Sequence, residues 1–275
     1  MSTSHTPQES EFRSWRSYWK FADHVQTKRR FVWDADIQAF LSAVSQTLRE
    51  RTVEISEGKL LWRAQSGIDR RRIEDDDGKL VEIEPRGFRR ERMKPLPNSN
   101  SEGRVNPAGI PVLYMATDKR TAISEVRPWI GHGVSVAQFR VRRRLKAVDL
   151  SKKRDDSKLG RNIPVDEEGW WPEEPSDPKD KEQYVWRDIE EAFLRPVTLN
   201  DNRTAYIPTQ ILAELFHREG FDAVIYRSAL GKSGRNVALF NLNDAEILNC
   251  SPYEVRGLEI TFKQIGNPWF NHQGD

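Results

Sequence analysis

The stretch Gly103–Pro128 reads GRVNPAGIPVLYMATDKRTAISEVRP and predicts a turn, a buried strand and a short helix in close succession. Its Gly, Asn and Pro residues suit tight turns. The apolar run Val112–Met115 predicts the strand. Asp118 can cap the helix, because its carboxylate accepts from backbone N–H groups that have no intrahelical partner. Pro128 would end the helix.

The same stretch carries three side chains that suit a pocket for a phosphorylated ligand. Arg104 precedes the glycine-bearing turn, Tyr114 lies in the strand and Glu125 lies on the helix. The alternative is that the turn, strand and helix are purely structural, with Glu125 on a solvated face.

Composition limits the classes of function. The 275 residues allow one large domain, or one with a small appendage, and nine Trp and twelve Phe supply a core. The net charge of +2 does not favour nucleic acid, so we expect no direct binding of it. A single cysteine, Cys250, rules out an internal disulfide and a multi-cysteine zinc site. The five histidines show no ligand spacing, so we expect no metal.

Two further patterns concern location. No stretch approaches the roughly 20 apolar residues that span a bilayer. The first residues, MSTSHTPQESEF, lack the basic-then-apolar pattern of a secretory signal. We therefore expect a soluble cytoplasmic protein without a membrane partner.

The N-terminal region predicts a helical extension over residues 1–55. Phe12–Trp33 interleaves aromatic and basic residues, which could stack on bases or dock the extension on a core; docking is the interpretation that we prefer. Asp34–Glu50 shows helical periodicity. Its apolar stripe consists of Ile37, Phe40, Leu41, Val44 and Leu48.

Residues 56–275 predict the main domain, with surface insertions at about 69–99 and 151–182. Lys59–Gln65 reads as a strand that places Arg63 in an apolar context, where a charge needs an anion or a carboxylate partner. Opposed charge blocks predict a solvated excursion or hairpin in the first insertion. In the second, Trp170 and Trp171 are expected to attach the segment to the surface.

The remaining elements alternate without a regular βαβ rhythm, which predicts an α+β fold. Thr209 is expected to cap the second late helix, and Gly220 to end it. The predicted helices are Tyr184–Leu194 and Thr209–Arg218; the predicted strands are Val134–Val141, Leu145–Leu150, Phe221–Arg227, Asn236–Asn241 and Val255–Lys263.

Several separate blocks, taken in order from Lys59 to Asn241, resemble the RES domain family, which is named after an Arg, a Glu and a Ser. Glu125 in AISEV and Ser228 in YRSAL supply the Glu and the Ser, and Arg63 or Arg104 the Arg. The other blocks are GRVNP, LY, TQ, FD and NVALF. The N-terminal extension and the two insertions depart from the family pattern, although the family has longer members with an added N-terminal region.

The resemblance implies an ADP-ribosyltransferase-like mixed sheet with flanking helices. It also implies an enzyme that cleaves the nicotinamide–ribose bond of NAD+ by phosphorolysis or hydrolysis, as a toxin neutralised by an Xre-type antitoxin. NAD+ would be the substrate and inorganic phosphate a possible co-substrate, without a further cofactor. A homodimer is compatible with this reading.

The residue types fit such chemistry. Glu125, Arg104 and Tyr114 are the expected catalytic residues: the carboxylate would stabilise positive charge on the ribose, the guanidinium would bind phosphate, and the phenol would contact the ribose. Arg63 and Ser228 are expected to bind substrate.

Two residues have weaker assignments. Asn236 is a further candidate for substrate binding, although an Asn that opens a strand is usually a turn residue. His132, between two glycines, could be a base but is expected to be a turn residue.

Two alternatives stay open from the sequence. The same pocket could transfer ADP-ribose to a protein or nucleic acid. A non-enzymatic nucleic-acid binder would instead use the N-terminal aromatics and the arginines within 70–72, 89–92 and 140–144.

Overall fold

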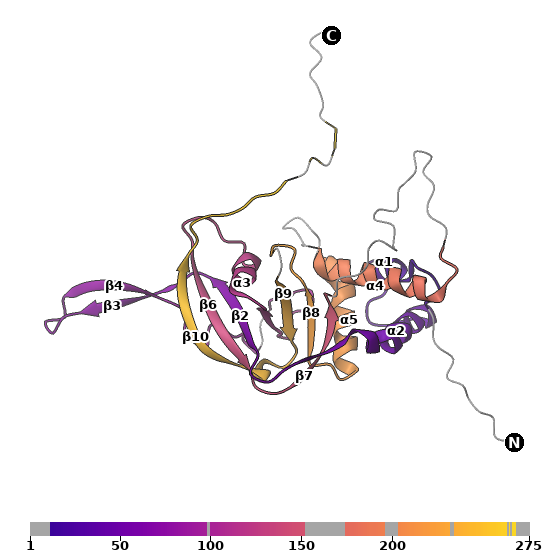
Figure 1. Cartoon of the computed structure of the whole chain (residues 1–275), viewed down its shortest axis with the longest axis horizontal. Coiled ribbons are helices and arrows are strands. Elements are labelled where there is room, and N and C mark those ends of the chain that lie inside the picture. The colour runs from indigo at the N-terminus through magenta and orange to yellow at the C-terminus, as the bar shows by residue number, and fades with distance from the viewer. Residues whose placement is uncertain are drawn as a thin grey trace, which may run out of the picture.

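The fold is α+β, as expected, and is built on one large mixed sheet (Figure 1). The computed structural model describes residues 12–97, 100–151, 174–195, 203–231, 234–262, 264 and 266–267. Eight strands form the sheet in the order β1-β7-β8-β9-β5-β2-β6-β10, and β3 and β4 form a separate hairpin.

The strands match most of the predicted ones to within two residues. They are β1 (Thr52–Ile55), β2 (Leu60–Ser66), β3 (Asp69–Glu74), β4 (Leu80–Arg86), β5 (Leu113–Ala116), β6 (Gly133–Val141), β7 (Leu145–Leu150), β8 (Ala223–Arg227), β9 (Arg235–Leu239) and β10 (Ala245–Glu254).

Five α-helices and three short 3₁₀ turns lie in the described ranges. They are α1 (Ser17–Thr27), α2 (Ala35–Thr47), α3 (Lys119–Glu125), α4 (Pro178–Leu194) and α5 (Ile207–Arg218), with η1 (Leu48–Arg51), η2 (Arg203–Tyr206) and η3 (Leu242–Asp244). Asp118 caps α3, where its side chain accepts from Thr121 N, as predicted.

Neighbouring strands are antiparallel except β7 and β8, which run parallel. A parallel pair needs a long crossover connection. Here the chain between the two strands contains α4 and α5, which lie with α1 and α2 at one end of the molecule (Figure 1).

The sheet is weakly joined in its middle. β2 pairs with β6 along its whole length, from Leu60 to Ser66, and β5 pairs with β9 from Leu113 to Ala116. Between β2 and β5 the register is a single pair, Trp62 opposite Ala116. The two strands separate beyond that pair, and a wedge opens between the halves of the sheet.

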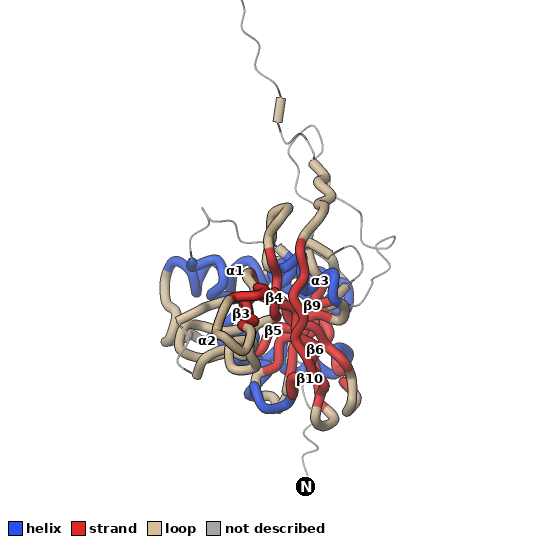
Figure 2. The backbone as a smooth tube through the Cα atoms, turned by 90° about the vertical axis from the view of Figure 1, so that its left-hand side faces the viewer, coloured by secondary structure: helices blue, strands red, loops and turns tan. Residues whose placement is uncertain are grey.

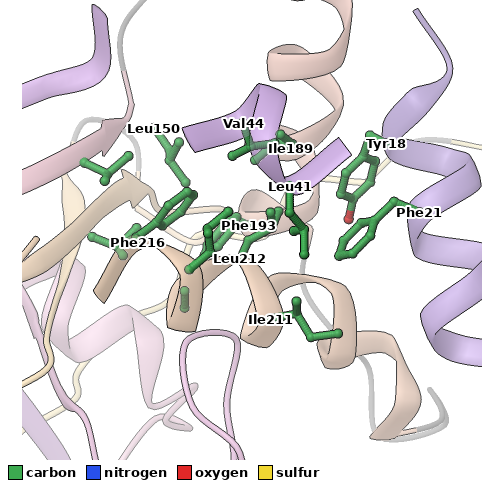
Figure 3. Close-up of a cluster of buried hydrophobic side chains, with 14 of the residues drawn as sticks. Tyr18, Phe21, Leu41, Val44, Leu150, Ile189, Phe193, Ile211, Leu212 and Phe216 are labelled. Atoms are coloured by element: carbon green, nitrogen blue, oxygen red, sulfur yellow. The ribbon is translucent and has the colours of Figure 1, made fainter. Parts of the chain in front are cut away.

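The N-terminal helices share the largest core with α4, α5 and the β7–β9 part of the sheet (Figure 3). Phe21 of α1 stacks on Phe40 of α2 at 4.6 Å between ring centroids. Trp186 of α4 donates its ring N–H to Thr47 Oγ1 at 3.0 Å. These contacts confirm that the aromatic N-terminal region docks on the core. The boundary between domains at residue 55 stays a prediction.

Docking uses only part of the N-terminal aromatic series. Trp15, Tyr18 and Phe21 are buried, whereas Trp19 is half exposed and Phe31 is 88% exposed. Buried rings cannot stack on bases, so this region offers little to the nucleic-acid-binding alternative.

The first insertion contains the β3–β4 hairpin, in which Arg71 lies opposite Glu84 and Arg72 opposite Ile83. Figure 1 shows the hairpin standing out from the sheet on the side away from the helices, and Figure 2 views it from that side. The hairpin interpretation is confirmed for 69–86. Residues 87–94 return to the body, where Phe88 and Met93 are buried.

Two local predictions are wrong. Residues 255–262 form no strand, because the last strand is β10, which pairs with β6 from Ala245 to Glu254, and the backbone bonds continue only to Val255, which bonds with Gly131 and His132. Thr209 is not a helix cap, because α5 begins at Ile207 and the Thr209 hydroxyl donates to Tyr206 O. Gly220, with φ 79°, follows α5 as predicted.

Other predictions cannot be compared with the described structure. Trp170, Trp171 and most of the 151–182 insertion lie outside the described residues. Within the described ranges, none of the helices has the length and apolar character that crossing a membrane requires.

The docking of α1 gives a first prediction. Phe21→Ala should lower the free energy of unfolding by about 3–5 kcal/mol, because it removes a buried ring and leaves a cavity. Phe31→Ala, at an exposed position, should change it by less than about 0.5 kcal/mol. Chemical denaturation of both variants measures the difference, and equal stabilities would show that α1 is not part of the cooperative core.

Candidate functional site

A cleft of about 670 Å³ lies at the wedge in the sheet. Its walls come from β2, β5, α3, the turn at 103–104, and the facing ends of β8 and β9. Five of the six predicted site residues line this cleft: Arg63, Arg104, Tyr114, Glu125 and Asn236.

Glu125 is the carboxylate of the cleft and the last residue of α3. Its Oε1 accepts from Ser228 Oγ at 2.6 Å and from Asn236 Nδ2 at 2.7 Å. Both donors are uncharged, so they fix one oxygen without neutralising the group. The carboxylate therefore keeps its charge available to a ligand in the cleft.

Ser228 supports Glu125 and does not itself line the cleft. Its Oγ accepts from the backbone N–H groups of Leu230 at 3.1 Å and Gly231 at 2.8 Å. Since both acceptor positions of the hydroxyl are occupied, its proton is directed to Glu125. Ser228 thus holds Glu125 in place, and its expected contact with substrate stays a prediction.

The loop that carries Ser228 is packed against the start of α3 through glycine. A Cβ at Gly234 would lie 1.7 Å from Thr121 Oγ1 and 2.2 Å from Asp118 Oδ2. Thr121 Oγ1 in turn donates to Asp118 Oδ2 at 2.8 Å. This close approach keeps Ser228 and Asn236 within reach of Glu125.

Arg63 occupies the wedge between β2 and β5. Its Nη1 donates to Tyr114 O at 2.8 Å, and its Nε is buried with no hydrogen-bond partner among the described residues. Burial lowers the pKa of Arg63 to about 10, because the desolvated guanidinium is disfavoured in its charged form. No described carboxylate forms a salt bridge with it. An anion in the cleft would supply the missing counter-charge.

Arg104 supplies a second cation, which is partly buried. Its Nη2 donates to Arg195 O, just beyond α4, at 2.8 Å, and its Nε is also buried without a partner among the described residues. The guanidinium carbon lies 5.9 Å from the ring centroid of Tyr226. Burial raises the pKa of Tyr226, and the neighbouring Arg104 opposes that rise, so this phenol stays protonated at neutral pH.

Tyr114 holds the turn that carries Arg104. Its hydroxyl donates to Asn106 Oδ1 at 2.7 Å and accepts from Val105 N at 3.0 Å. A Cβ at Gly103 would lie 2.6 Å from this hydroxyl, so only glycine lets the turn approach. Burial raises the pKa of Tyr114. The Tyr114 hydroxyl is therefore used to hold the turn, and the aromatic ring is the part of Tyr114 that can contact a ligand in the cleft.

Three further residues belong to the site and were not among the predicted ones. Gln210 of α5 donates through Nε2 to Gly103 O and Asn106 O, both at 3.0 Å, and so fixes the same turn from the helix side. Tyr206 and Tyr226 line the cleft. Gln210 and Tyr226 stand in the TQ and YRS blocks, which is the signal that could have identified them; no sequence pattern marks Tyr206.

Of Arg127 and His132, which follow α3, only Arg127 lines the cleft. Arg127 lines the cleft with φ 46°, the left-handed conformation in a non-glycine residue, and turns the chain sharply after α3. His132 is exposed, and its Nδ1 accepts from Trp129 N at 3.5 Å, so the turn interpretation of this histidine is confirmed. Among the described residues, no three His, Cys, Asp or Glu side chains are grouped as metal ligands.

Comparison with known proteins identifies the family. A model of the RES domain matches residues 79–262, so the chain belongs to the RES domain family. The match includes every predicted site residue except Arg63. Among solved structures, the crystal structure of the M. tuberculosis MbcT–MbcA toxin–antitoxin complex is similar at 11% identity and a TM-score of 0.37, over 77% of this chain and 92% of that chain. No curated protein sequence matches the chain.

The unpaired charge of Arg63 gives a second prediction. Arg63→Met should leave the free energy of unfolding within about 1 kcal/mol of the wild type or raise it, because a desolvated charge is replaced by an apolar side chain. It should also remove the stabilisation by pyrophosphate, which for the wild type reaches about 2.7 kcal/mol at a hundred times the Kd. Thermal unfolding with and without pyrophosphate measures both effects.

Arg120→Met provides the matched control, because Arg120 is exposed and pairs with Glu259 outside the cleft. This variant should keep the full response to pyrophosphate. An unchanged response in Arg63→Met would contradict an anion-binding role for Arg63.

The contact at Gly234 gives a third prediction. Gly234→Ala should destabilise the protein by about 1–3 kcal/mol, because the added methyl group forces the loop away from α3. Gly257→Ala, where a Cβ would meet nothing within 4 Å, should change stability by less than about 0.5 kcal/mol. Equal melting temperatures in the two variants would show that the loop and α3 are not held together by this approach.

Proposed function

We propose that this RES domain protein cleaves the nicotinamide–ribose bond of NAD+, with phosphate or water as the acceptor. The observation that carries the proposal is the charge layout of the cleft. Two guanidinium groups, Arg63 and Arg104, each have a buried Nε without a hydrogen-bond partner and lack carboxylate partners among the described residues, and one carboxylate, Glu125, lacks a cationic partner there. NAD+ carries a complementary pattern, with two phosphates next to a ribose that bears a cationic base.

The reaction breaks the bond between the ribose C1′ and the ring nitrogen of nicotinamide. The electron pair of that bond goes to the ring nitrogen, so nicotinamide leaves as a neutral molecule and needs no general acid. Positive charge develops on the ribose as the bond lengthens, as in glycoside cleavage. An oxygen of phosphate or water then bonds to C1′; a water molecule releases one proton to solvent.

Glu125 would stabilise the positive charge on the ribose. The Ser228 and Asn236 donors hold its Oε1, which leaves Oε2 to face the sugar and accept from a ribose hydroxyl. A fixed carboxylate needs little reorganisation as charge develops, and this is the basis of electrostatic catalysis.

Arg63 and Arg104 would bind the diphosphate through their buried, unpartnered N–H groups. Hydrogen bonds between guanidinium and phosphate are charge-assisted and often bidentate. The rings of Tyr114, Tyr206 and Tyr226 would enclose the nicotinamide nucleotide, in a cleft whose volume lies within the usual range for small-ligand sites.

The nucleic-acid-binding alternative receives less support from the structure. Arg140 pairs with Glu246, Arg143 with Asp222 and Asp244, and Arg144 with Glu54. These guanidinium groups already form ion pairs with carboxylates, so they are less available to bind phosphates. Transfer of ADP-ribose to a macromolecule would use the same cleft and stays the second candidate. A toxin role, an Xre-type antitoxin partner and a homodimer stay predictions.

The decisive experiment incubates the purified protein with NAD+, with and without inorganic phosphate, and quantifies nicotinamide and the second product. A phosphorylated ADP-ribose formed only with phosphate identifies a phosphorylase, and free ADP-ribose without phosphate identifies a glycohydrolase. A labelled macromolecular adduct identifies a transferase. If NAD+ is not consumed under any of these conditions, the proposal is refuted.

Glu125→Gln gives a fourth prediction. Nicotinamide release should fall by about a hundredfold or more, because the amide keeps the contacts with Ser228 and Asn236 but loses the charge. The melting temperature should stay close to that of the wild type. Glu214→Gln, on the exposed face of α5, is the matched control and should retain full activity. Full activity in Glu125→Gln would remove this residue from the mechanism.

A further inference from the structure

A second cavity, of about 530 Å³, adjoins the cleft, and Arg63, Gln65 and Tyr114 line both. Its other walls come from residues 91–96 and from the segment that leads into β5. These walls are mainly apolar and include Pro95, Leu96, Pro111 and Val112. Ser101 and Asn106 add polar groups.

We propose that this second cavity binds the adenosine end of the dinucleotide, and this inference rests on the proposed function. The assignment follows from comparing the order of side chains along the two cavities with the order of chemical groups along NAD+. The carboxylate of Glu125 lies in the first cavity and not in the second, so the reacting ribose and nicotinamide belong in the first. Arg63, which would hold the diphosphate, stands at the boundary between the two cavities. The part of NAD+ beyond the diphosphate is adenosine.

The walls of the cavity suit a purine nucleoside. A flat base needs apolar surfaces on its two faces and a few hydrogen-bonding groups at its edge. Pro95, Leu96 and Val112 supply apolar surface, and Ser101 is among the polar lining residues, whereas the Asn106 amide is already bonded to Tyr114, Ser101 and Pro107. Among the described residues that line the cavity, Glu91 is the only carboxylate, and Arg92 and Lys94 are cationic.

The outer wall of the cavity is anchored to the body. Gln65 Nε2 donates to Arg92 O at 2.8 Å, and Lys94 Nζ donates to Leu242 O at 2.8 Å. The Arg92 guanidinium lies over the Phe88 ring at 3.5 Å, and Phe88 is buried in the core. The cavity is therefore preformed, and binding there needs little ordering of the chain.

Residues 91–96 form one wall of the cavity, follow the β3–β4 hairpin and lie within the part of the chain that the RES domain model matches. Through this wall the segment would contribute substrate specificity. An adenosine-binding wall would favour the dinucleotide over nicotinamide mononucleotide, which contains the same scissile bond but lacks adenosine.

The test introduces Leu96→Trp, which narrows the cavity from its rim, where Leu96 is 70% exposed and tolerant of a larger side chain. The ratio of kcat/KM for NAD+ to that for nicotinamide mononucleotide should fall by about tenfold or more, because the lost contacts concern adenosine alone. Ser101→Trp, at another lining position, should have the same effect. Ile110→Trp is the matched control, since Ile110 is 55% exposed and lines neither cavity.

Binding of ADP, measured by isothermal titration calorimetry, provides a readout that does not depend on turnover. Wild type and Ile110→Trp should bind ADP, and Leu96→Trp should bind it about tenfold more weakly. Equal affinities for ADP, or no binding to the wild type, would overturn the adenosine site even if NAD+ is cleaved. ADP binding that is weakened by Leu96→Trp, in a protein that leaves NAD+ intact, would support the site while refuting the proposed reaction.

Discussion

The site depends on a sheet that is joined at one position in its middle. β2 and β5 meet at Trp62 and Ala116 and then separate, and the Arg63 guanidinium bridges the wedge by donating to Tyr114 O. A continuous ladder would bury this position between paired strands. At the wedge, the Arg63 side chain reaches a cavity although most of its surface is shielded from water. A shielded positive charge is unfavourable without a counter-charge, so an anion bound in the cavity would stabilise Arg63.

The elements around the wedge fix each functional group from more than one side. Gln210 and Tyr114 hold the turn that carries Arg104, while Ser228 and Asn236 hold Glu125. The helices that support Arg104 are also those on which the N-terminal region packs. Arg51, just before β1, forms a buried ion pair with Glu190 of α4, the helix that ends next to Arg195. The N-terminal region is thus connected to the site through α4.

The charge distribution in the cleft relates stability to function. A buried guanidinium without a counter-ion lowers the stability of the free protein, and an anionic ligand recovers that free energy on binding. Close packing at two glycines stabilises the site. Gly103 and Gly234 let the backbone approach neighbouring side chains closely, and this approach holds the polar groups of the cleft rigidly. Preorganised polar groups of this kind are typical of sites that stabilise developing charge.

The sequence alone determined the class of fold, most strands and helices, and the residue types of the site, because apolar periodicity, capping and glycine-rich turns are local properties. It also indicated Glu125 and Ser228 through their short motifs. Only the tertiary structure decided that Ser228 positions Glu125, that Gln210 supports the Arg104 turn, and that 255–262 is not a strand. These features depend on contacts between segments far apart in the chain, such as the approach of Gly234 to α3, and local patterns do not encode which segments meet.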